Sequence, residues 1–265
     1  MVKKTRFGNR TLVKFLLDNS CSLLYHHSMT LSEYGRLSGS PSPVNRMMAS
    51  FARDFREGMD INLDIGLVNE KTIPGDLIQK ALAEVISQRE KYKTPLNYGG
   101  PAGSPNMIAS IKNFLCKQAA GGLTGEILKC KQILIGSNGA TSILEAVADI
   151  LEPGIVITSD PMYYIYCNLL ERKSFTVVTV PEDSEGIKPE LIDELLEAPG
   201  FRKEAIRFFY IVTVGNPTST ILANNRRRHI VKTASHLSLE LGRKIPVLFD
   251  GAYEGLIHDP SVEPP

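Results

Sequence analysis

An aspartate and a tyrosine stand three residues apart, just after an apolar run near the end of the chain. Residues 249–256 read Phe-Asp-Gly-Ala-Tyr-Glu-Gly-Leu, which places Asp250 at the end of a predicted strand and Tyr253 in the following turn. A carboxylate there can accept a charge-assisted hydrogen bond from a cationic ring nitrogen, a partner that an electron-withdrawing ring cofactor needs. The alternative is that Asp250 only caps the turn.

A glycine turn at the start of a predicted helix could bind a phosphate group. Ser-Asn-Gly-Ala-Thr at 137–141 follows the apolar run 133–135 and precedes helical spacing of apolar residues up to 151. The backbone N–H groups of Gly139, Ala140 and Thr141 would be free to donate, and the helix dipole favours negative charge at this end. An ordinary helix cap formed by Ser137 or Asn138 is the alternative.

Two further polar segments each follow an apolar run. Asp-Pro-Met-Tyr at 160–163 comes after the run 155–157, and Gly-Asn-Pro-Thr at 215–218 comes after the run 208–212. Taken singly, Tyr163 could be a core tyrosine, and Asn216 could belong to an ordinary Asn-Pro-Thr loop. The combination of these segments with Asp250, each just beyond a candidate strand, favours one shared site.

In order and spacing these segments resemble those of fold-type I enzymes that use pyridoxal 5′-phosphate (PLP), the aspartate aminotransferase-like class I/II family. The resemblance covers roughly residues 58–259. It implies transfer of an amino group between an amino acid and a 2-oxo acid. It also implies catalytic roles for Asp250, which would keep the pyridine nitrogen protonated, and for Tyr253. The residues that it assigns to cofactor binding are Tyr98, Gly139, Ala140, Thr141, Tyr163, Asn216, Asp250 and Tyr253.

Two of the implied site residues lie further upstream. Tyr98, in Tyr-Gly-Gly-Pro-Ala-Gly, resembles the family tyrosine that reaches the phosphate of the neighbouring subunit's cofactor, which implies a homodimer. Gly66, at the end of the predicted strand 61–66, stands where the family backbone approaches the substrate carboxylate. Leu-Val-Asn-Glu follows Gly66 instead of the family's Asp-Pro-type turn. For Tyr98 the alternative is a loop before a helix capped by Ser104.

Strands and helices alternate after residue 60, which predicts a three-layer α/β/α fold with a mostly parallel sheet buried on both faces. Ligands of such sheets bind beyond the carboxyl ends of the strands, where the motifs fall. The predicted helices are 76–92, 105–120, 140–151, 163–172, 189–196 and 224–241, and the predicted strands are 133–136, 155–158, 175–180, 207–212 and 245–249. The Arg-Arg-Arg-His run at 226–229 is interpreted as a solvated basic face.

The first 57 residues differ from the rest in charge and are interpreted as an N-terminal arm or extension, with 58–265 as the PLP-binding large domain. Basic residues outnumber acidic ones there, and serines are scattered between them. Such a start could also be an organelle-targeting segment. Arms of the family often lie across the dimer partner.

Composition favours a cytoplasmic protein. The chain has 265 residues, is 43% hydrophobic and 22% charged, and carries a formal net charge of +1, which gives no global attraction to nucleic acid or membranes. The sequence has no apolar run long enough to span a bilayer. The 4 cysteines are far apart and lack zinc-binding spacing, so the sequence predicts no metal site.

The lysine that the family uses to form a Schiff base with PLP is not found after Asp250 within these 265 residues. Lys244 is the last lysine, and about six residues of strand at about 3.3 Å each should place it near the opposite end of the sheet. The expectation is therefore an incomplete large domain without the C-terminal small domain, inactive by itself. A catalytically inactive remnant or interaction module, or a PLP lyase or synthase on the same scaffold, stay open as alternatives.

Overall fold

The computed structural model describes residues 30–39, 41, 43–63, 66, 68–93, 95–98, 100–118, 122–259 and 261–262. Contacts group the chain into two compact units, Met1–Gly39 and Ser40–Pro265. The segment in which a targeting sequence could lie, residues 1–29, falls outside the described residues. The proposed division at residue 57 stays a prediction.

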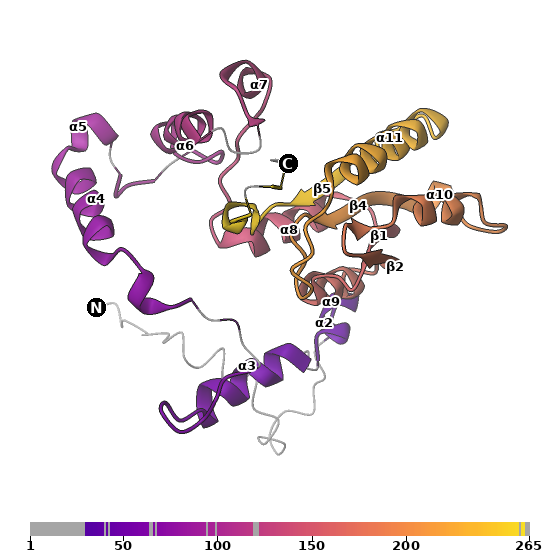
Figure 1. Cartoon of the computed structure of the whole chain (residues 1–265), viewed down its shortest axis with the longest axis horizontal. Coiled ribbons are helices and arrows are strands. Elements are labelled where there is room, and N and C mark those ends of the chain that lie inside the picture. Colours follow the sequence, from indigo (N-terminus) through magenta and orange to yellow (C-terminus); the bar gives the residue numbers. More distant parts are fainter. Residues whose placement is uncertain are drawn as a thin grey trace, which may run out of the picture. The chain divides into compact units, whose positions relative to one another are not determined.

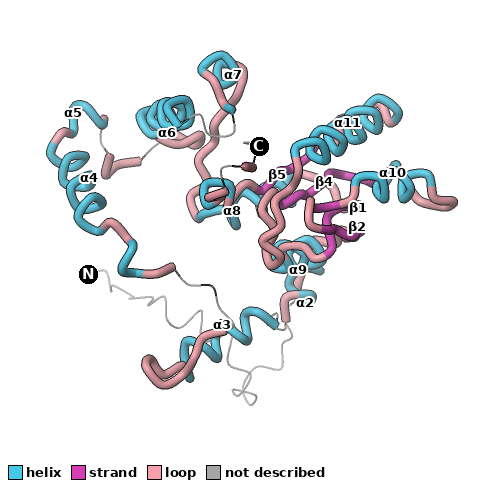
Figure 2. Tube along the Cα trace, viewed as in Figure 1, coloured by secondary structure: helices cyan, strands magenta, loops and turns pink. Residues whose placement is uncertain are grey.

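Among the described residues, five strands form one sheet in the order β3-β2-β1-β4-β5. Figures 1 and 2 label β2, β1, β4 and β5 of this sheet. The strands are β1 (Ile155–Asp160), β2 (Thr176–Asp183), β3 (Gly186–Ile187), β4 (Ile206–Val212) and β5 (Val247–Asp250). Strands β2, β1, β4 and β5 run parallel, and β3 pairs antiparallel with β2. The predicted mostly parallel sheet is confirmed.

The helices of the second unit are α3 (Pro43–Asp54), α4 (Gly75–Ser87), α5 (Arg89–Tyr92), α6 (Pro105–Gln118), α7 (Gly125–Lys129), α8 (Gly139–Ile150), α9 (Tyr164–Arg172), α10 (Pro189–Glu197) and α11 (Asn224–Glu240). Short 3-10 turns lie at η1 (Glu70–Thr72), η3 (Lys203–Ala205) and η4 (Glu254–Leu256). The first unit contains α2 (Glu33–Leu37).

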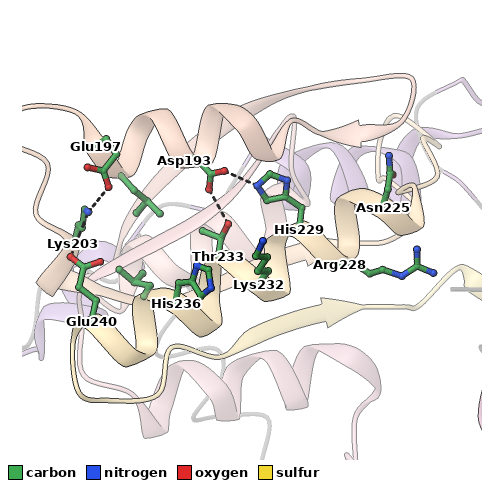
Figure 3. Close-up of a pocket in the computed structure, with 12 residues that line it drawn as sticks. Asp193, Glu197, Lys203, Asn225, Arg228, His229, Lys232, Thr233, His236 and Glu240 are labelled. Carbon is green, nitrogen blue, oxygen red and sulfur yellow. Dashed lines mark hydrogen bonds and ion pairs between the residues drawn. The ribbon is translucent and has the colours of Figure 1, made fainter.

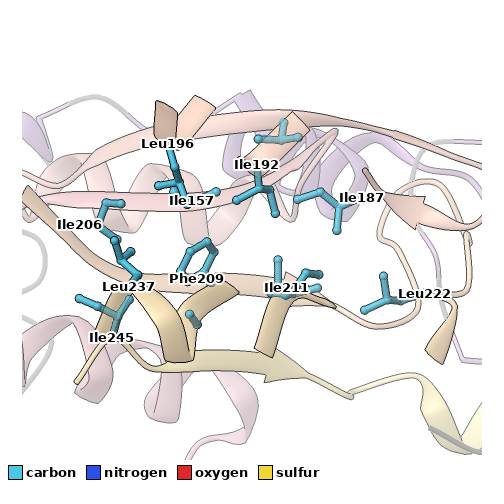
Figure 4. Close-up of a cluster of buried hydrophobic side chains, with 13 residues drawn as sticks. Ile157, Ile187, Ile192, Leu196, Ile206, Phe209, Ile211, Leu222, Leu237 and Ile245 are labelled. Atoms are coloured by element: carbon cyan, nitrogen blue, oxygen red, sulfur yellow. The ribbon is translucent and has the colours of Figure 1, made fainter. Parts of the chain in front are cut away.

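Helices cover both faces of the sheet, and the alternation of side chains along β4 shows how. Phe208 and Tyr210 pack with α8 and α9 on one face. Phe209 and Ile211 point to the other face, where residues of α10 and α11 complete a second cluster (Figure 4). Because successive side chains of a strand point to opposite faces, an almost uninterrupted apolar strand supplies both cores. The predicted α/β/α layering is therefore confirmed.

Three predicted elements differ from the structure. Residues 133–136 form no strand: Leu134 is 62% exposed, and the backbone N–H of Ile135 donates to the carbonyl of Ala102 over 3.3 Å instead of to a neighbouring strand. The predicted strand 61–66 is also not formed by its described residues 61–63, which are irregular. The predicted helix 76–92 is interrupted at Gln88, whose ψ of 57° is not helical, and so forms α4 and α5.

Four of the helices and strands described above, as well as the short 3-10 turns, were not predicted. The helices α2 and α7 are only five residues long and are stabilised by caps. The hydroxyl of Ser32 caps α2, and that of Thr124 caps α7 by accepting from the backbone N–H of Ile127 over 3.3 Å. Caps of this kind stabilise a turn or two without a long apolar pattern. The remaining elements are α3 and the two-residue strand β3.

Candidate active site at the carboxyl ends of the strands

Asp250 is the last residue of β5, and hydrogen bonds fix both its backbone and its carboxylate. The carbonyl of Asp250 accepts from the backbone N–H of Thr213 over 3.0 Å and from the Thr213 hydroxyl over 3.1 Å. The hydroxyl of Tyr210 donates to Oδ2 over 2.8 Å, and the backbone N–H of Ala252 donates to Oδ1 over 3.1 Å. The half-buried carboxylate therefore does cap the turn, and a neighbouring strand holds it as well.

Tyr253 lies in the turn after β5, close to the loop that contains Asn216. The Asn216 amide donates to the Tyr253 hydroxyl over 3.5 Å, at the upper limit for a hydrogen bond. The loop itself is closed by the backbone N–H of Gly215, which donates to the carbonyl of Thr220 over 2.8 Å. A side chain at Gly215 would collide with Thr218, so glycine permits this tight loop. The structure thus brings Asn216 and Tyr253 together.

Tyr163 precedes α9 and packs against the cluster that contains Tyr210. Burial raises the pKa of the Tyr163 hydroxyl, and the nearby Tyr253 and Asp250 raise this pKa further. Tyr163 follows the carboxyl end of β1 by three residues, and β1, β4 and β5 are neighbours in the sheet, so Tyr163 lies at the same edge of the sheet as Asp250 and Tyr253. Tyr163 is therefore partly a core residue, and it also borders the ends of the strands.

The first turn of α8 begins at Gly139 with a φ of +62°, a conformation that favours glycine. Asn138 occupies the cap position without a side-chain hydrogen bond to the helix, and the first turn holds no acidic residue. The Ser142 hydroxyl instead accepts from the backbone N–H of Asn138 over 3.2 Å. The first turn thus offers backbone N–H donors, and Thr141 and Tyr163 line one small cavity together.

The structure does not bring Tyr98 or Gly66 to this group. The Tyr98 side chain is 100% exposed, and nothing lies within 4 Å of where a Cβ on Gly66 would stand. Lys244 lies before the start of β5, whereas Asp250 lies at its end. The expected position of Lys244 at the opposite end of the strand is confirmed.

Sequence reasoning missed Tyr210 and Thr213, which hold Asp250, and also Arg227 and Glu254. Arg227 lies 5.3 Å above the ring of Phe249 and donates to Oε1 of Glu254 over 3.1 and 3.2 Å. A tyrosine within an apolar strand was the available signal for Tyr210. The basic run 226–229 was interpreted wrongly in part, since the side chains of Arg226 and Arg227 are only 13% and 19% exposed and both form ion pairs.

A separate groove of about 690 Å³ runs between α10 and α11 (Figure 3). In it Asp193 pairs with Nε2 of His229 at 2.6 Å and accepts from the hydroxyl of Thr233 over 2.9 Å, and Lys203 pairs with Glu197 at 2.7 Å. None of the predicted site residues lines this groove. The described residues contain no group of three potential metal-binding side chains, and none of their helices is long and apolar enough to cross a membrane.

Residues 61–264 match the family described as aminotransferase class I and II. The chain belongs to this family. The aromatic-amino-acid aminotransferase 1 of Thermococcus litoralis is 21% identical over 178 residues, which cover 66% of this chain and 41% of that protein. The resemblance inferred from the motifs is thus confirmed at the level of the family.

Two solved structures of aminotransferases share the fold. The kynurenine aminotransferase of Pyrococcus horikoshii, solved with PMP, has a TM-score of 0.65 and 23% identity over 77% of this chain and 48% of that chain. The multiple substrate aminotransferase of Thermococcus profundus has a TM-score of 0.68 and 21% identity over 89% of this chain and 54% of that chain. The present chain therefore spans about half the length of these relatives.

The cofactor of this family of enzymes is PLP, and the side chains at the strand ends are of suitable chemistry for it. The Asp250 carboxylate already accepts two hydrogen bonds and retains lone pairs for a third donor, such as a protonated ring nitrogen. The start of α8 offers backbone N–H groups without a competing acid, and open space surrounds Gly139. The residues that are present therefore fit the group.

Proposed function

We propose that this chain forms the cofactor-binding part of a PLP-dependent aminotransferase, which transfers an amino group between an amino acid and a 2-oxo acid. The observation that carries the proposal is that Asp250, Tyr253, Asn216 and Tyr163 all lie at or just beyond the carboxyl ends of neighbouring parallel strands, where Asn216 also contacts Tyr253. Membership of the family supports the same reaction. When bound, PLP supplies an electron-withdrawing ring for the electrons of a breaking substrate bond.

Each residue has a proposed task toward that cofactor. Asp250 keeps the ring nitrogen protonated, because a carboxylate at hydrogen-bond distance favours the cationic form. Tyr163 lies against the ring, and Asn216 and Tyr253 donate to the ring oxygen. The backbone of Gly139, Ala140 and Thr141 would bind the phosphate. Gly66, which the structure does not bring to this group, would border the substrate carboxylate, a role that rests on the resemblance of the motif.

The proposal extends to assembly and location. Tyr98 would reach the phosphate at the site of the partner in a homodimer, an interpretation supported by its complete exposure. A cytoplasmic location is proposed from the balanced charge of +1. A targeting role for the basic start of the chain, or an arm in residues 1–57, also stays a proposal.

Equilibrium dialysis of PLP against the 265-residue chain tests the proposed site. Asp250→Asn should weaken binding by about tenfold or more, because the amide cannot pair as an anion with the ring nitrogen. Asp193→Asn is the matched control, since the Asp193 carboxylate also has two side-chain contacts, with His229 and Thr233, but lines the groove between α10 and α11, which none of the predicted site residues lines. If both variants bind PLP as tightly as the wild type, the assignment of Asp250 is wrong. If the wild type shows no saturable binding, the proposed site as a whole is contradicted.

A further inference from the structure

We propose that Tyr210 is a positioning residue, which fixes the Asp250 carboxylate for its contact with the ring nitrogen of the cofactor. This inference rests on the proposed function and adds a residue that the motifs do not contain. Tyr210 lies within β4, six residues before Asn216, and its side chain is completely buried. The sequence alone would assign it to the core.

Strand geometry explains why Tyr210 and Asp250 meet. Tyr210 pairs with Leu248 in the parallel register of β4 and β5, and Asp250 follows two residues after Leu248. Residues two apart on a strand share a face, and both Leu248 and Tyr210 belong to the cluster beside α8 and α9. Asp250 therefore leaves the sheet on the face of Tyr210, within 2.8 Å of its hydroxyl.

The Tyr210 hydroxyl can act toward Asp250 only as a donor. Burial, followed by the negative charge and the hydrogen bond of Asp250, raises the pKa of Tyr210, so the phenol stays protonated. Tyr210 holds Oδ2 from a neighbouring strand, whereas Ala252 holds Oδ1 from the following turn. Two donors from different elements define the orientation of the carboxylate before any ligand binds, and such preorganisation strengthens a charged hydrogen bond.

Tyr166 provides a matched comparison for the effect of the hydroxyl alone. It is 2% exposed, and its ring packs edge-on against that of Tyr210 with centroids 4.7 Å apart. Its hydroxyl, in contrast, has no hydrogen-bond partner among the described residues. Tyr166→Phe and Tyr210→Phe therefore remove the same atom from the same core, but only the second removes a contact with Asp250.

The test compares two ligands of the 265-residue chain: pyridoxamine 5′-phosphate and its deaza analogue, in which a carbon replaces the ring nitrogen. Isothermal titration calorimetry gives both dissociation constants, and their ratio isolates the contribution of the ring nitrogen. The wild type should prefer pyridoxamine 5′-phosphate. Tyr210→Phe should reduce this preference by about tenfold, the size expected for a hydrogen bond to a charged group, whereas Tyr166→Phe should leave it unchanged.

The outcomes separate this inference from the proposed function. A wild type that binds neither ligand, or both equally, contradicts the proposed function and this inference with it. If the wild type prefers pyridoxamine 5′-phosphate and Tyr210→Phe keeps this preference, the inference about Tyr210 is contradicted but the proposed function is not. The same holds if Tyr166→Phe lowers the preference as much as Tyr210→Phe does. If Tyr210→Phe does not fold, fluorotyrosine at position 210 keeps the ring shape and makes the hydroxyl a stronger donor. The preference should then be kept or increased, and its loss would contradict the inference.

Discussion

Gly136 and Gly139 lie three residues apart before and at the start of α8, and their surroundings differ. A Cβ on Gly136 would stand 2.6 Å from Cγ1 of Ile143 and 2.9 Å from Oγ of Ser142. A Cβ on Gly139 would meet nothing within 4 Å, although the φ of +62° is unfavourable for other residues. Gly136 is therefore needed for packing, and Gly139 for backbone conformation and for the space beside the N–H groups.

These two positions give a paired prediction. Gly136→Ala should lower the free energy of unfolding by about 1–3 kcal/mol through overpacking. Gly139→Ala should cost only about 1 kcal/mol of stability but weaken PLP binding, because its methyl group enters the proposed phosphate space. Urea unfolding and dialysis measure the two effects. An unchanged PLP affinity in Gly139→Ala would contradict a phosphate site at this helix.

At the scale of elements, an ion pair joins α11 to the turn that follows β5. Arg227 and Glu254 are 19% and 28% exposed, and Nε of Arg227 is buried without a hydrogen-bond partner among the described residues. Arg227 also covers the ring of Phe249, the residue before Asp250. The position of the Asp250–Tyr253 turn therefore depends on α11.

We expect Glu254→Gln to lower stability by about 1–3 kcal/mol, because it leaves a partly buried guanidinium without its anion. The substitution should also weaken PLP binding by loosening the turn that carries Tyr253. Glu240→Gln is a suitable control, since Glu240 lies at the other end of α11 and is 55% exposed, and Lys203, with which it forms an ion pair at 3.5 Å, keeps a shorter ion pair with Glu197 at 2.7 Å. Chemical unfolding checks the stability, and equal losses in the two variants would argue against a specific role of Glu254.

A second ion pair joins the β2–β3 hairpin to α11. Arg226 contacts Asp183 at 2.7 Å and also donates to the carbonyl of Gly186. The hydrogen bond from Arg226 lowers the pKa of Asp183 from 3.8 to about 2. Because the folded-state pKa lies below the ordinary value, this stabilisation is complete above the ordinary pKa and is lost as the pH falls toward 2.

The wild type should therefore be more stable than Asp183→Asn at about pH 6, and this advantage should shrink between about pH 4 and pH 2. The physical reason is that protonated Asp183, like asparagine, carries no charge to pair with Arg226. Urea unfolding curves at several pH values give the difference directly. A stability difference that stays constant down to the acid limit would mean that Asp183 contributes through shape and not through its charge.

The elements that the sequence predicted well are those whose own residues carry the signal. The apolar runs of β1, β4 and β5 end in polar motifs, and both the strands and the position of these motifs at one edge of the sheet follow from this pattern. The partners of Asp250 could not be predicted in the same way. Tyr210 reaches it only through the β4–β5 register, and Arg227 reaches Glu254 across 27 residues of chain. Contacts of this kind depend on tertiary structure.

At the scale of the whole molecule, side-chain burial differs between the sheet region and the preceding helices. Strand β4 is almost completely buried, whereas α3, α4, α5 and α6 have no buried side chain among their described residues. Helix α4 exposes Leu77, Ile78 and Leu82 at 65%, 56% and 56% on one side. Apolar surface of this extent is typical of a face that another surface covers.

We expect a second copy of this chain to cover that surface, because the proposed role of Tyr98 also requires a partner subunit. A two-fold dimer uses the same patch on both copies, so one substitution disrupts the interface twice. Ile78→Glu should therefore shift the protein from dimer toward monomer in sedimentation velocity, whereas Lys80→Glu, two residues away on another side of α4, should not. PLP binding should weaken together with dimerisation if Tyr98 contributes to the partner's site. A wild type that sediments as a monodisperse monomer and binds PLP normally would show that each chain forms its site alone, and would leave Tyr98 as a loop residue.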